Sequence, residues 1–198
     1  MIDPEKFEFV KKKYGWYASW AIWVETGDRP KDNVGDLSIF DAEKNPGLFL
    51  QLNPGIILVG LNISRGALTT PLANFHDARS EAMDYKIRYA LAGSLLWGAY
   101  MTDIIKDFDQ KNSGKVMGYL RKNRQFEEKN ARMFREEIHD LGHDNPLIVA
   151  FGRDVYTILK RNLSDDFRII RIPHYSNYCS REKYREEVHH VIRNIVSI

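Results

Sequence analysis

An uninterrupted apolar run, residues 56–59 (IILV), follows Asn-Pro-Gly and precedes a long polar segment. A strand with one face in water alternates apolar and polar residues, so a continuous run predicts a strand buried on both faces, as in a parallel sheet. Three further segments are typical of such strands: 99–105, 147–151 and 167–172. A sheet buried on both faces must be covered by helices on both sides.

Helical periodicity lies between and after these strands. It predicts helices over 80–96, over 115–141 as one or two helices, over 153–162, and from Ser180, which suits an N-cap, to the end of the chain. Strands that alternate with helices favour right-handed crossovers between parallel strands. We therefore expect an α/β fold with three layers, α/β/α, and a four-stranded parallel sheet.

The N-terminal region follows a different pattern. Residues 4–24 are predicted to form one helix, because Trp16, Trp20 and Trp23 recur at i, i+4 and i+7. Such a stripe is usually buried, and we assign it to the core rather than to a surface on which bases stack. Residues 26–36 are rich in Gly, Pro, Asn and Asp, which predicts a loop. This loop is a candidate cover for a ligand pocket.

Composition excludes several classes of protein. The 198 residues are 43% hydrophobic and 28% charged, which is typical of a folded chain, and we expect a single domain. No apolar run reaches the ~20 residues that a membrane-spanning helix needs. The net charge of +2 neither requires nor forbids a nucleic-acid partner. The one cysteine, Cys179, excludes an intrachain disulfide and a four-cysteine zinc site, and favours the cytoplasm.

Ligands of open parallel sheets bind beyond the carboxyl ends of the strands. The segments at those ends are 60–64, 102–103 and 173–178. Asn62 offers one acceptor and two donors, so it can hold a water or a base edge, or it can simply fill a turn. His174 can donate a hydrogen bond to an anion that develops on a ligand, or it can be a structural residue.

Three other residues near these ends have a functional and a structural interpretation. Phe75 can stack on a flat base or pack in the core. Asp103 can accept from a ligand or cap a turn. Arg181, at the start of the last helix, lies where a phosphate would be bound by backbone N–H groups and the helix dipole.

Other patterns give weaker hypotheses. His139 and His143 are spaced i, i+4, but no third metal ligand is specified, so we assign no metal site. The basic residues in 121–135 alternate with glutamates, which is typical of a solvated helix face. Cys179 lies close to His174 in sequence, but nothing shows an oriented Cys–His pair. The chain contains no phosphate-binding or nucleophile-elbow motif.

Five motifs occur in the order found in the uracil-DNA glycosylase superfamily. Residues 57–64 (ILVGLNIS) resemble its first motif, in the form typical of the mismatch-specific thymine/uracil branch. Residues 71–75 (PLANF) resemble the P-A-N-x-F segment of that branch, and 100–106 (YMTDIIK) resemble a strand shared by several branches. Residues 147–159 resemble the strand and helix before the last motif. Residues 173–176 (PHYS) resemble the H-P-S-P loop.

The resemblance implies a fold and a reaction. The implied fold is a four-stranded parallel sheet flanked by helices, over residues 55–196, with residues 1–50 as an N-terminal helical extension. The implied reaction is hydrolysis of the bond between a base and deoxyribose, after the base has been flipped out of DNA into a pocket. Neither a metal nor an organic cofactor is implied. The partner is DNA, or a nucleobase or nucleotide ligand.

The resemblance also implies roles for individual residues. Asn62 corresponds to the residue that positions the attacking water, and His174 to the residue that stabilises charge on the departing base. Phe75 corresponds to the aromatic side chain that stacks on the base. The other substrate-binding residues implied are Gly60, Leu61, Asp103 and Ser176. The DNA-binding residues implied are Tyr175, Asn177, Tyr178 and Arg181.

Some positions differ from the family pattern. Ile63, Tyr175 and Asn177 stand where the motifs have proline, and the first motif has no carboxylate, so we expect any activity to be slow. Asp103 stands where members that bind uracil often have Asn. An ionised carboxylate only accepts hydrogen bonds, so a base with an amino group, such as cytosine or adenine, or a modified base fits Asp103 better than uracil does.

Two alternatives to a DNA glycosylase remain. The altered motif positions favour a non-catalytic protein that binds nucleic acid, a nucleobase or a nucleotide. An unrelated small-molecule hydrolase on a similar α/β frame is the other, because a fold does not determine a function.

Overall fold

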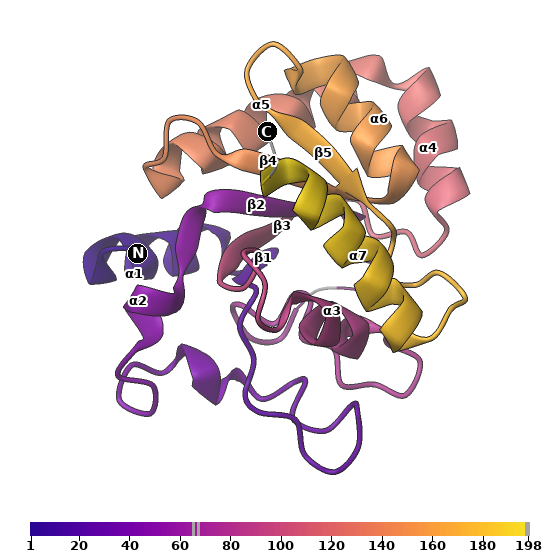
Figure 1. Cartoon of the computed structure of the whole chain (residues 1–198). Coiled ribbons are helices and arrows are strands. Elements are labelled where there is room, and N and C mark those ends of the chain that lie inside the picture. The colour runs from indigo at the N-terminus through magenta and orange to yellow at the C-terminus, as the bar shows by residue number, and fades with distance from the viewer. Residues whose placement is uncertain (65, 67, 197–198) are drawn as a thin grey trace.

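A five-stranded mixed sheet forms the centre of the computed structural model, which describes residues 1–64, 66 and 68–196 (Figure 1). The strand order is β1-β3-β2-β4-β5. The strands are β1 (Ala18–Trp20), β2 (Asn53–Asn62), β3 (Ala99–Ile105), β4 (Leu147–Phe151) and β5 (Ile169–Ile172). The expected α/β class is confirmed, and β2 to β5 are parallel to one another.

The prediction of four parallel strands is wrong, because the sheet has a fifth strand. β1 pairs antiparallel with β3 at the edge of the sheet, with Ala18 opposite Thr102 and Trp20 opposite Tyr100. The three-residue strand is completely buried. An antiparallel edge strand on an otherwise parallel sheet is common in α/β folds.

The predicted helix over 4–24 is also wrong, because the first helix, α1 (Pro4–Tyr14), ends before the tryptophans. The chain turns at Gly15, whose carbonyl accepts a hydrogen bond from Leu72 N–H at 2.7 Å. Trp20 then lies in β1 and is fully buried, whereas Trp16 is half exposed. The region is therefore not purely helical, and Trp16 does not belong to the core.

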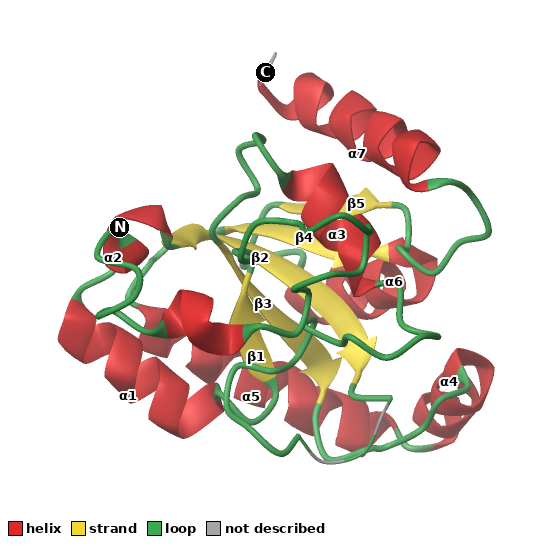
Figure 2. Ribbon diagram, turned by 90° about the horizontal axis from the view of Figure 1, so that it is seen from below, coloured by secondary structure: helices red, strands yellow, loops and turns green. Residues whose placement is uncertain are grey.

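Helices cover both faces of the sheet (Figure 2). Ile57 and Val59 of β2 pack with α1, α5 (Arg124–Leu141) and α6 (Gly152–Leu163) on one face. Ile56 and Leu58 pack with α3 (Asp84–Leu91) and α7 (Arg181–Val196) on the other. These residues alternate along one apolar strand, as expected for burial on both faces. The remaining helical elements are η1 (Leu37–Phe40), α2 (Leu48–Gln51) and α4 (Ser113–Lys122).

The helices differ in detail from the prediction. The segment predicted over 80–96 forms a helix only at α3, and 115–141 divides into α4 and α5 around Asn123. Within the described residues, no helix has the length and apolar character that crossing a membrane requires.

Candidate functional site

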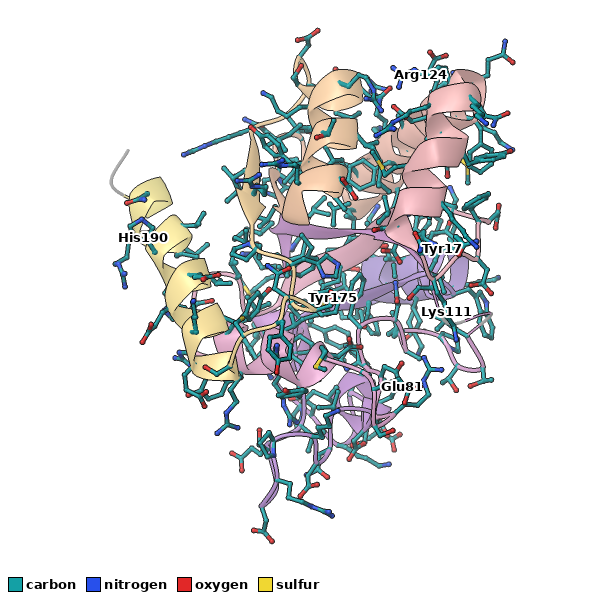
Figure 3. All side chains as sticks on the ribbon, turned by 90° about the vertical axis from the view of Figure 1, so that its right-hand side faces the viewer. Tyr17, Glu81, Lys111, Arg124, Tyr175 and His190 are labelled. Atoms are coloured by element: carbon teal, nitrogen blue, oxygen red, sulfur yellow. The ribbon has the colours of Figure 1, made fainter. Side chains whose placement is uncertain are left out.

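A cavity of about 600 Å³ lies beyond the carboxyl ends of the parallel strands, at the edge of the sheet where a ligand was expected. Figure 3 labels three of its lining residues, Glu81, Lys111 and Tyr175, which come from three different segments. The structure brings together most of the predicted site residues, since the lining includes Gly60, Leu61, Asn62, Asp103, His174, Tyr175, Ser176 and Asn177. Phe75 lines a smaller adjoining pocket of about 70 Å³.

Gly60 allows a carboxylate and an aromatic ring to approach β2 closely. A Cβ atom at this position would overlap Asp103 Oδ1 and would lie 3.1 Å from Phe75 Cζ. Asp103 is the parallel neighbour of Gly60 on β3 and is 3% exposed. Asn74 Nδ2 donates to Asp103 Oδ2 at 2.9 Å, and it also donates to the carbonyl of Tyr17. The side chain of Asp103 is therefore held at the edge of the cavity.

Asn62 has its amide orientation fixed by backbone carbonyls. Its Nδ2 donates to the carbonyls of Ile63 at 3.2 Å, Phe108 at 2.8 Å and Gln110 at 3.0 Å. Within the described part of the chain, no group donates to Oδ1, and Asn62 is only partly buried. Oδ1 is therefore available to accept a hydrogen bond from a water or a ligand in the cavity.

His174 is held as one tautomer. The backbone N–H of Ser176 donates to His174 Nδ1 at 3.1 Å, and Ser176 Oγ lies 2.8 Å from the same atom. Because Nδ1 accepts, the proton of the neutral ring is on Nε2. Burial lowers the pKa of His174 below its usual value, although the charge of Asp154 acts in the opposite direction. The side chain therefore presents a neutral Nε2–H donor at physiological pH.

Aromatic rings connect His174 with the adjoining pocket. His174 stacks on Tyr175 with ring centroids 4.5 Å apart, and the rings of Tyr175 and Phe151 are nearly perpendicular with centroids 5.3 Å apart. Phe151 in turn lies 6.0 Å from Phe75. Tyr178, in contrast, is completely exposed. Of the two tyrosines with an implied role in DNA binding, Tyr178 is therefore free to contact a large partner, whereas Tyr175 is packed inside the site.

Arg181 lies outside the lining of the cavity. Its Nε forms an ion pair with Glu182 Oε1 at 2.7 Å, and its guanidinium lies over the ring of Tyr89 at 4.6 Å. These contacts hold Arg181 at the start of α7, and its role in binding a phosphate stays a prediction.

The loop that carries His174 is anchored by a buried lysine on α3. Lys86 is 4% exposed, and its Nζ donates to the carbonyls of Asn177 at 3.0 Å and Cys179 at 2.8 Å. No pattern in the sequence identifies this contact, because a lysine that binds backbone carbonyls needs no matching residue type.

Replacement of this lysine, Lys86→Met, is expected to loosen residues 174–180, because two carbonyls lose a charged donor. We expect a loss of about 1–3 kcal/mol in the free energy of unfolding and faster amide hydrogen exchange in the loop. Hydrogen exchange read by mass spectrometry measures both effects. Lys183→Met, at an exposed position on α7, is the matched control. Equal exchange in the two variants would show that Lys86 does not hold the loop.

Several residues of the cavity were not predicted. Gly152 to Val155, at the N-terminus of α6, line it together with Lys111, Asp77, Arg79 and residues 81–84. Gly152 has a φ of +86°, and a Cβ atom there would lie 3.2 Å from His174 Cβ. The glycine in the motif-like segment 147–159 was visible in the sequence, but its contact with the histidine loop was not.

The loop over 26–36 supplies none of the described residues that line the cavity. Arg88 of α3 instead holds this loop through the carbonyls of Pro30 at 2.9 Å and Asp32 at 2.8 Å. The prediction that this loop covers the pocket is therefore wrong.

The described residues include no group of three or more His, Cys, Asp or Glu side chains that could hold a metal ion.

Comparison of the chain with family models, with curated proteins and with solved structures finds no match.

Proposed function

We propose that this protein hydrolyses the N-glycosidic bond of a nucleotide that is flipped out of DNA into the cavity at the carboxyl edge of the sheet. The observation that carries the proposal is the neutral Nε2–H donor of His174, whose tautomer Ser176 fixes at the edge of that cavity. The bond breaks as negative charge grows on the departing base, and a preoriented donor stabilises that charge more strongly than it stabilises the bound substrate.

The other half of the reaction needs a water on the sugar. When the C1′–N bond breaks, its electron pair leaves with the base, and a water oxygen bonds to C1′. Asn62 Oδ1 accepts a hydrogen bond from that water and orients it, because the amide is held by the carbonyls of Phe108 and Gln110. The water loses one proton to solvent, the departing base takes up one proton from solvent, and the products are a free base and an abasic sugar. An amide is a poor base, so the reaction is expected to be slow.

The non-catalytic alternative is favoured by one observation. All of the hydrogen bonds of Asn62 Nδ2 go to backbone carbonyls, which is also what a purely structural asparagine would do. In that case the protein binds a nucleotide or a strand in the cavity and releases it unchanged.

Short duplexes with one test base each separate the two functions. The bases are uracil, hypoxanthine and xanthine, and thymine, cytosine and adenine each placed in a mismatch, and strand breakage at abasic sites is measured after alkali. We expect breakage with at least one base and a loss of about 10²–10⁴-fold in Asn62→Ala. Asn194→Ala, at an exposed position on α7, is the control for a generic asparagine replacement.

The rate of strand breakage for each variant must be compared with its melting temperature, so that a loss of activity is not confused with unfolding. If Asn62→Ala keeps the wild-type melting temperature and the wild-type rate, Asn62 has no part in the reaction. If the folded wild type in excess breaks none of the duplexes but binds them, the non-catalytic function is correct.

A further inference from the structure

A strip of lysines on α4 is the second feature of this edge of the molecule. The α4 strip consists of Lys111, just before the helix, and Lys115 and Lys122, which share one helical face at i, i+7. We infer that the α4 strip binds the phosphate backbone of the nucleic-acid strand whose nucleotide enters the cavity. The inference rests on the proposed nucleic-acid substrate, and it does not depend on cleavage of the glycosidic bond.

The charge of this region is unbalanced. Residues 110–126 contain five basic residues and no acidic residue. Lys111, Lys115 and Lys122 are all exposed, and among the described residues none of them forms an ion pair with a carboxylate. Two of the three arginines of α5 differ in this respect, since Arg124 pairs with Glu127 and Arg135 pairs with Asp166. A polyanion is the partner that unpaired surface cations fit.

The position of the α4 strip also points to a strand that continues from the cavity. Lys111 is one of the residues that line the cavity, together with Ser113 at the start of the helix. Asn62 bonds the carbonyls of Phe108 and Gln110 and so ties the preceding loop to the candidate catalytic residue. One cation in the lining of the cavity and two more along the helix thus form a row that leads away from the place proposed for the sugar.

The dimensions agree with this occupant. From Lys115 to Lys122 the helix rises about 10 Å, which spans about three phosphates of one strand. Tyr119 lies between these lysines on the same face, is 37% exposed, and stacks on Phe108 at 4.6 Å. A rigid aromatic ring between cations is a surface on which an unpaired base can stack.

Gly118 allows a clean test on the same face. A Cβ atom at this position would meet no atom within 4 Å, so larger side chains fit without changes in packing. Gly118→Lys, Gly118→Gln and Gly118→Glu differ in charge and have similar helix propensities, so their stabilities are expected to be similar. The probes are a fluorescent 15-nucleotide single strand and its duplex, and binding is measured by anisotropy at several salt concentrations.

We expect affinity to fall in the order Lys, Gln, Glu. Each unit of charge is expected to change Kd by about fivefold at low salt, which is the effect of one charge ~4 Å from a phosphate in water. The slope of log affinity against log salt is expected to change by about 0.7 to 0.9 per phosphate contact. Equal Kd values for the three variants would overturn the inference, even if the wild type cleaves DNA.

A pair of existing lysines gives an independent measurement. Lys115→Gln/Lys122→Gln is expected to weaken binding of both oligonucleotides about 25-fold at low salt. The control is Lys160→Gln/Arg168→Gln, which removes two exposed cations elsewhere and is expected to keep affinity within twofold. Equal losses in both pairs would show a non-specific charge effect and overturn the inference.

The proposed function and this inference can fail separately. If the affinity for oligonucleotides depends on salt and follows the charge at position 118, but no base is released, the inference is supported and the proposed hydrolysis is contradicted. If a base is released but the three Gly118 variants have equal Kd values, the hydrolysis is supported and the inference is contradicted. If the charge at position 118 changes the affinity for phosphatidylserine vesicles but not for either oligonucleotide, the partner is a lipid surface and the inference is overturned.

Discussion

For the proposed release of a base, Asp103→Asn is expected to reverse the preference among bases. The wild type should release bases with an amino group, such as cytosine or adenine, faster than uracil, and the variant should prefer uracil. Asp103 lines the cavity and is 3% exposed, so a base that pairs badly with it leaves polar groups buried without partners. Each such group costs about 1–3 kcal/mol, and two of them change the ratio of rates by about 30-fold to about 3 × 10⁴-fold.

The direction follows from the chemistry of the side chain. A carboxylate only accepts, so it suits an amino donor and repels the O4 atom of uracil. An amide presents one acceptor and two donors, so it can match the acceptor and the N–H of uracil together. The replacement is nearly isosteric, and an amide oxygen still accepts from Asn74. The close approach to Gly60 is therefore expected to be preserved.

The measurement is the single-turnover rate on duplexes that differ only in the target base. Asp154→Asn is the matched control, because it removes a negative charge from the same cavity without changing the residue beside Gly60. The control is expected to change all rates by a common factor. A ratio of uracil to cytosine rates that is the same in Asp103→Asn and in the wild type would show that Asp103 does not contact the base.

The sequence predicted the central strands well, because burial on both faces leaves a clear signal. The bounds 99–105 and 147–151 match β3 and β4 in the structure. The N-terminal error has a specific cause. Aromatic residues at i, i+4 and i+7 predict a helix, but aromatic and β-branched residues also favour strands, and the turn at Gly15 decides between them.

The residues of the candidate site that lie at the ends of strands could be predicted from the sequence. The contacts made by segments far away in the sequence could not. Asn62, Asp103 and His174 line one cavity because carboxyl ends of parallel strands meet at one edge. The anchoring by Lys86 depends on backbone carbonyls from a segment far away in sequence. The path of residues 77–84 into the cavity likewise follows from tertiary packing and has no local pattern.

Asp103 is supported from the opposite side by a buried ion pair. Lys106 and Glu137 lie 2.8 Å apart, and their side chains are 2% and 1% exposed. Lys106 also donates to Thr102 Oγ1 at 2.7 Å and to the backbone carbonyl of Asp103. Tyr100 donates to Glu137 Oε1 at 2.6 Å, and burial, together with this carboxylate, raises the pKa of Tyr100 well above its usual value. Tyr100 is therefore a permanent donor.

Glu137→Gln is expected to lower the free energy of unfolding by about 3–5 kcal/mol, because it leaves the ammonium of Lys106 buried without a counter-charge. Glutamine has the size of glutamate and still accepts from Tyr100, so the variant isolates the lost charge. Urea denaturation measures the change. Glu136→Gln, which is exposed one residue earlier, is expected to stay within about 0.5 kcal/mol of the wild type.

The double variant Lys106→Met/Glu137→Gln separates the stability of the fold from the support of the site. Removing the second charge should recover much of the lost stability, because a buried ion pair adds little over an apolar contact of similar size. The backbone carbonyl of Asp103, however, loses its donor when Lys106 is replaced. We therefore expect a stable protein in which base release is slower than in the wild type. A double variant as unstable as Glu137→Gln would show that the charge of Lys106 is not the cause of the instability. Full recovery of both stability and rate would show that Lys106 does not position Asp103.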